Sequence, residues 1–77
     1  YIRKERTKSM KGMLVTNTIN LLQAKATQHK LNIKLLLENQ QTIPEHTDIT
    51  EAILGELKLL AEYEDQLETF KKYFEGN

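Results

Sequence analysis

Two histidines and eleven carboxylates are the side chains of this sequence that could transfer protons or bind a metal. Glu45, His46 and Asp48 lie close together, but a metal site needs three or four convergent ligands, and this loop supplies no fixed geometry. Another acidic group lacks the Glu-x-x-His pairs used by dimetal centres in helical bundles; it comprises Glu62, Glu64, Asp65 and Glu68. We therefore predict no metal and no other cofactor.

Nucleophilic catalysis finds equally little support. There is no cysteine, Ser9 is the only serine, and no glycine-rich phosphate loop is present. The lack of cysteine also excludes disulfides and cysteine-ligated zinc sites. We predict that the protein is not an enzyme.

Helices are predicted by two long apolar repeats whose members are separated alternately by four and three residues. This alternation is typical of a helix face that lies along another helix. The first repeat comprises Val15, Ile19, Leu22, Ala26, His29, Ile33 and Leu36, and the second comprises Ile49, Ile53, Glu56, Leu60, Tyr63, Leu67, Phe70 and Phe74. We call these two sets of positions the helix seam and expect them to form an interface between helices.

His29 and Glu56 are the polar interruptions of the seam. Folding the chain back on itself near residues 43–44 brings them within about one helical turn of each other. One hypothesis is a half-buried hydrogen bond that fixes the register of the helices or responds to protons, because a neighbouring carboxylate raises the pKa of a histidine. The alternative is that both side chains lie at the edge of the seam and point into water.

The chain divides at QQTIPEHTD, because Pro44 cannot continue a helix and restricts the residue before it. Asp48 followed by Glu51 resembles a capping box, and Gly76 is a plausible helix stop. We therefore expect one domain, residues 1–77, with an exposed basic arm or frayed helix start at 1–9, a helix at 10–40, a loop at 41–47 and a helix at 48–75. The fold class is all-α, an antiparallel two-helix hairpin. A break near residues 27–32, giving a three-helix bundle, is the alternative.

Charge supports the antiparallel arrangement. Residues 1–37 carry eight Lys and Arg against one Glu, whereas residues 38–77 carry three Lys against ten Asp and Glu. A chain that folds back between these halves sets positive beside negative along its length. Each exposed ion pair contributes only a few tenths of a kcal/mol, so the effect is mainly on orientation.

Apolar residues outside the seam indicate a further contact. Five leucines lie off the seam: Leu14, Leu21, Leu31, Leu35 and Leu37. Near residues 31–37 the apolar arc is therefore too wide for one neighbouring helix, and aromatic residues gather near the end of the second helix. We expect a homodimer that completes a four-helix bundle, or docking on a larger helical partner. The corresponding function is that of a protein–protein interaction or assembly module.

Two other interpretations remain open. Basic residues near the N-terminus suit phosphates or an acidic partner, which would make the protein a small nucleic-acid-associated regulator; they are Arg3, Lys4, Arg6, Lys8 and Lys11. The first residue, Tyr1, suggests instead a helical segment of a longer multidomain protein. No apolar run is long enough for a membrane span, and we expect an intracellular location, most simply the cytoplasm.

Overall fold

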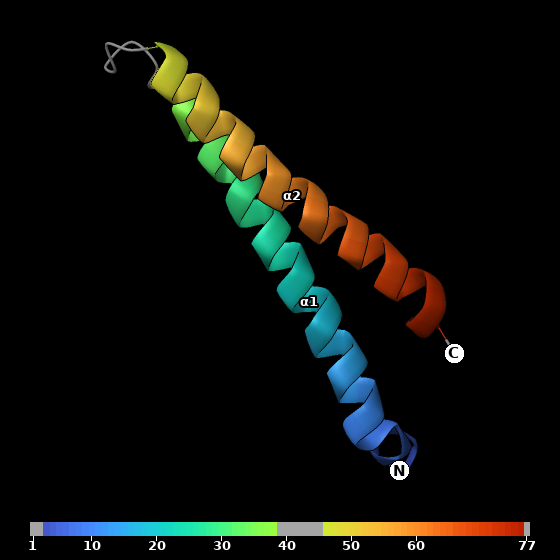
Figure 1. Ribbon diagram of the computed structural model, residues 1–77. Helices are drawn as coiled ribbons and strands as arrows, with labels where there is room; N and C mark the ends of the chain where they lie inside the picture. The colour runs from blue at the N-terminus through green and yellow to red at the C-terminus, as the bar shows by residue number, and fades with distance from the viewer. Residues whose placement is uncertain (1–2, 39–45, 77) are drawn as a thin grey trace.

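The computed structural model describes residues 3–38 and 46–76, and within these ranges the protein is entirely helical (Figure 1). Helix α1 spans Arg3–Glu38 and helix α2 spans His46–Phe74, and the two pack side by side as an antiparallel hairpin. The molecule is elongated, with extents of 61 × 23 × 13 Å. No helix in the described ranges has the length and apolar character needed to cross a membrane.

Helix α1 is continuous through residues 27–32, so the three-helix alternative is wrong. Neither glycine nor proline occurs between residues 13 and 43, and the seam keeps its phase across this region. The weaker helix formers there are compensated by packing against α2, which is how most helices in proteins are stabilised.

The helix ends differ in detail from the expected bounds. Residues 3–9, expected as a basic arm or a frayed helix start, form the first turns of α1. Helix α2 already begins at His46, so Asp48 lies in its first turn and is not the cap that the capping box requires. In the first turn, the carboxylate of Asp48 interacts favourably with the positive end of the helix dipole. The expected loop at 41–47 lies largely outside the described residues, as do residues 39–40.

The C-terminal stop of α2 is confirmed. Gly76 has a φ of +86°, a conformation that glycine adopts without the steric penalty of a Cβ atom. The amide of Glu75 donates a hydrogen bond of 3.2 Å to the carbonyl of Lys71, which satisfies one of the unpaired carbonyls at the helix end.

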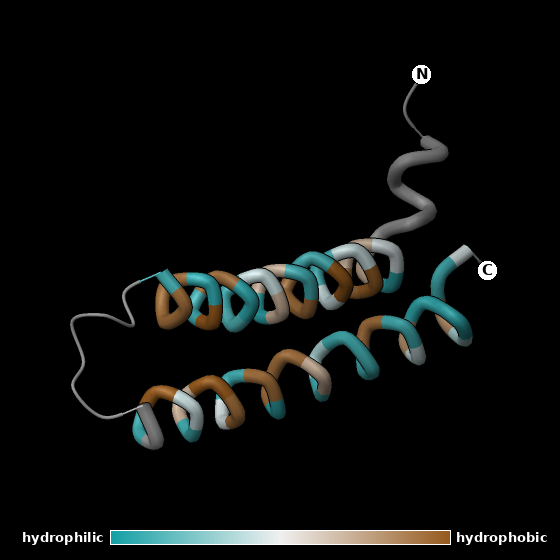
Figure 2. Tube along the Cα trace, turned by 90° about the horizontal axis from the view of Figure 1, so that it is seen from above, coloured by the Kyte–Doolittle hydropathy of each residue, from teal (hydrophilic) through white to brown (hydrophobic). Residues whose placement is uncertain are grey.

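The space between the helices is thinly filled. Only Ala26 and Ile49, each 6% exposed, are buried hydrophobic residues in the described chain. The other seam residues are half-buried, except Phe74, which is 57% exposed. In the view of Figure 1 the ribbons of the two helices overlap near the connection and separate toward the two termini. Hydrophobic residues also occur on more than one side of α1 (Figure 2).

Gly55 is a surface glycine in the middle of α2. A Cβ atom built at this position would meet no atom within 4 Å, so the residue does not serve a close approach of the helices. We expect Gly55→Ala to raise the free energy of unfolding by about 1 kcal/mol, because alanine loses less backbone entropy in a helix. Chemical denaturation measures this difference, and a destabilised variant would show that Gly55 has a packing role.

Candidate interaction surface

A polar contact joins the two helices near the middle of the seam. Nδ1 of His29 lies 2.7 Å from Oε1 of Glu56 and donates a hydrogen bond to that carboxylate, and Nδ2 of Asn32 donates a second one of 3.0 Å to the same oxygen. The His29 and Glu56 side chains are 16% and 28% exposed. The ring of Tyr63 stacks on that of His29, with centroids 5.6 Å apart and an interplanar angle of 6°. The hydrogen bond hypothesised from the sequence is therefore present.

These contacts stabilise the charged form of Glu56. Its pKa lies below the ordinary value, chiefly because His29 donates a hydrogen bond to the carboxylate and secondly because Asn32 does so. Partial burial acts in the opposite direction, and attraction to His29 adds a smaller lowering. The arrangement fixes the register of the helices, because sliding one helix along the other would separate the carboxylate from both donors.

The lowered pKa predicts a pH dependence of stability. A carboxyl group whose pKa is lower in the folded state stabilises the fold above its unfolded pKa, about 4.3, and this contribution is lost as the pH falls through the folded pKa. Glu56→Gln keeps an oxygen acceptor but does not titrate, so subtracting its unfolding free energy from that of the parent protein cancels the other carboxyl groups. We expect the stability of the parent protein to fall relative to that of the variant as the pH decreases below about 4.3. A pH-independent difference would contradict the role of Glu56.

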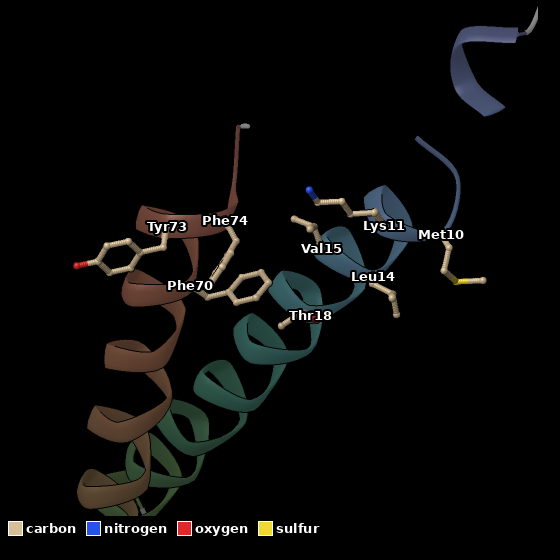
Figure 3. Close-up of a pocket in the computed structure, with 8 residues that line it drawn as sticks. All are labelled: Met10, Lys11, Leu14, Val15, Thr18, Phe70, Tyr73 and Phe74. Atoms are coloured by element: carbon tan, nitrogen blue, oxygen red, sulfur yellow. The ribbon is translucent and has the colours of Figure 1, made fainter. Parts of the chain in front are cut away.

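The diverging ends of the helices enclose an open cleft of about 630 Å³ (Figure 3). Helix α2 contributes an aromatic cluster, in which the rings of Phe70 and Phe74 have centroids 5.1 Å apart and those of Tyr73 and Phe74 6.4 Å apart. The ammonium group of Lys72 lies 5.3 Å from the ring centroid of Tyr73. Helix α1 contributes Met10, Lys11, Leu14, Val15 and Thr18. This end of the hairpin therefore presents apolar side chains that the two helices do not bury.

Exposed hydrophobic residues extend well beyond the cleft. Twelve large hydrophobic side chains of the described chain are at least 38% exposed, among them six leucines or methionines of α1 that precede Leu37. Contiguous apolar surface of this kind on a small protein usually marks a site of protein contact. The sequence indicated the off-seam leucines of α1, the excess near residues 31–37 and the aromatic end of α2, but not the exposure of Met10 and Met13.

On the outer face of α2, one series of exposed apolar positions does not continue into the second half of the helix. Leu54 and Leu57 are 57% and 47% exposed, and Ala61 continues their alternating four-and-three spacing. The next two positions of the same series are Glu64 and Glu68, which are exposed carboxylates. That series on α2 is therefore interrupted by charge. A series on α1 with the same spacing, from Met10 through Leu21 to Leu35, has no charged member.

The basic residues predicted to contact phosphates or an acidic partner are only partly described. Lys11 is exposed and lines the cleft. The side chains of Arg3, Lys4, Arg6 and Lys8 lie outside the described part of the structure, although their backbone belongs to α1.

No group of three or more possible metal ligands occurs among the described side chains. Comparisons of the chain with protein-family models, with curated proteins and with solved structures find no match.

Proposed function

We propose that this chain is a non-enzymatic protein–protein interaction module that completes its core by pairing with a second copy of itself, so that four helices assemble. The observation that supports the proposal is that the hairpin exposes many more large hydrophobic side chains than it buries. The hairpin buries only Ala26 and Ile49, and it leaves twelve large hydrophobic side chains exposed in the described residues. A two-helix unit of this size rarely has enough core to be stable alone, and oligomerisation is a common remedy.

Self-association predicts that thermal stability depends on protein concentration. When folding and dimerisation are coupled, mass action raises the unfolding temperature as the concentration rises. We expect the melting temperature, followed by circular dichroism, to rise steadily over a hundredfold range of concentration. A sharp melting transition that does not move with concentration would mean that the hairpin is stable as a single chain, and it would contradict the proposal.

A second candidate function is contact with nucleic acid through the N-terminal turns of α1. The observation that favours it is that α1 is helical from Arg3 onward, which gives the basic residues a regular spacing. Removing four basic residues that contact phosphates lowers the affinity for DNA, and the affinity that remains depends less on salt concentration. Joint replacement of Arg3, Lys4, Arg6 and Lys8 by alanine would abolish salt-sensitive DNA retention, whereas replacement of Lys25, Lys30, Lys34 and Lys58 would serve as the charge-matched control. Equal loss in both variants would argue against this site.

A further inference from the structure

Helix α1 carries a second regular face, which we call the outer stripe. Its eight positions follow the same alternation of four and three residues as the seam, and all eight are exposed: Met10, Leu14, Asn17, Leu21, Ala24, Gln28, Leu31 and Leu35. The five large hydrophobic members are between 49% and 65% exposed. At 3.6 residues per turn the outer stripe lies roughly 140° around the helix from the seam, so α2 does not cover it.

Resting on the self-association proposed above, we infer that the outer stripe packs antiparallel against the outer stripe of a second copy. The partner of this surface is thus α1 of another identical chain, and α2 lies on the outside of each hairpin. About a two-fold axis between Leu22 and Gln23, each member of the stripe meets another member. Met10 faces Leu35, Leu14 faces Leu31, Asn17 faces Gln28, and Leu21 faces Ala24.

The polar members fix the register of this pairing. Asn17 of each copy lies opposite Gln28 of the other copy, so the dimer contains this pair twice. The side-chain amides of each pair can exchange hydrogen bonds inside an otherwise apolar contact. A shift by one repeat in either direction would place these amides opposite apolar residues, which would leave them without partners. Beside the axis, small Ala24 meets large Leu21, a combination that lets the two helices approach closely.

Charge selects the antiparallel orientation. A parallel pairing also matches amide with amide, but it sets the basic N-terminal turns of both copies together. Residues 3–11 carry five Lys and Arg against one Glu, so this arrangement is repulsive. The antiparallel pairing moves these segments to opposite ends of the dimer, each beside the end of the other α1, where the chain changes from basic to acidic at Glu38.

The other exposed faces suit self-pairing less well. The outer face of α2 ends in Glu64 and Glu68, and burying unpaired carboxylates is costly. Within 10–35 of α1, by contrast, the outer stripe contains no charged residue over about 38 Å of helix. It therefore offers a longer uncharged surface than the outer face of α2.

The test uses single cysteines, which report cleanly because the chain has none of its own. Chains that carry Met10→Cys are mixed with chains that carry Leu35→Cys. The mixture is oxidised and examined for disulfide-linked dimers. We expect the mixture to form cross-links between unlike chains, and each variant alone to form almost none, because like positions lie about 38 Å apart in the antiparallel dimer. Leu54→Cys on the outer face of α2 is the control and is expected to stay uncross-linked.

The outcomes separate this inference from the broader proposal. Efficient cross-linking of Met10→Cys chains with themselves would mean a parallel dimer and would overturn the inference. A dimeric mass without cross-links in the mixture would mean that another face is used, which also overturns the inference but leaves self-association intact. A monomeric mass at all concentrations, with no cross-links, would refute the inference and the proposed function together.

Discussion

Leu21→Asp is expected to break the dimer, weakening self-association by roughly a hundredfold or more. Leu21 is 59% exposed in the single hairpin, so the substitution costs little there. In the antiparallel pairing, however, Leu21 lies against Ala24 of the second copy, and symmetry places two such carboxylates near the centre of the interface. Two like charges buried near each other repel, which adds to the cost of removing them from water. The dissociation constant from sedimentation equilibrium, measured for the variant and the parent protein, gives the size of the effect.

Leu54→Asp is the matched control for this experiment. Leu54 is 57% exposed, almost the same as Leu21, and it belongs to the outer face of α2. The variant has the same change of charge and side chain, and its self-association is expected to match that of the parent protein. If Leu54→Asp were the more disruptive of the two, the contact between copies would lie on α2 rather than α1.

Ile49→Ala is expected to lower the free energy of unfolding by about 3 kcal/mol. Ile49 is only 6% exposed and is the one large hydrophobic side chain that the described hairpin buries. Its truncation removes apolar contacts and leaves a cavity between the helices near the connection. Because a protein of this size is stable by only several kcal/mol, the change removes a large share of the total.

Denaturant unfolding at one fixed protein concentration measures this loss, since self-association contributes to the apparent stability. Leu57→Ala is the appropriate control because Leu57 is 47% exposed on the same helix. We expect it to cost less than about 1 kcal/mol. A cost for Ile49→Ala no greater than that of the control would contradict the burial that the structure gives to Ile49.

The hairpin itself could be predicted from the sequence, because two signals agreed. The alternating spacing marked one face on each helix, and Pro44 marked the division between them. The same fold-back brought His29 to Glu56, and the structure contains their hydrogen bond. Asn32 as a second donor to Glu56 was missed because it lies outside the seam, although its i+3 spacing from His29 places both side chains on the same side of α1.

Other features of the structure could not be predicted from the spacing of residues in the sequence. Phe74 is exposed at the end of α2, although its position in the repeat equals that of half-buried Leu67. Leu14, Leu21, Leu31 and Leu35 are recognisable from the sequence as off-seam leucines, but Asn17 and Gln28 interrupt them, so the outer stripe does not register as an apolar repeat. Asp48 was taken for a helix cap because its spacing to Glu51 fits a capping box, but α2 begins at His46.

Sedimentation equilibrium over a wide range of concentrations tests the central claim most directly. The account predicts a reversible equilibrium that reaches twice the chain mass of 9.0 kDa and stops there, since pairing of the two outer stripes closes the interface. A folded hairpin that remains at 9.0 kDa at every concentration would contradict the claim that this chain completes its core with a second copy.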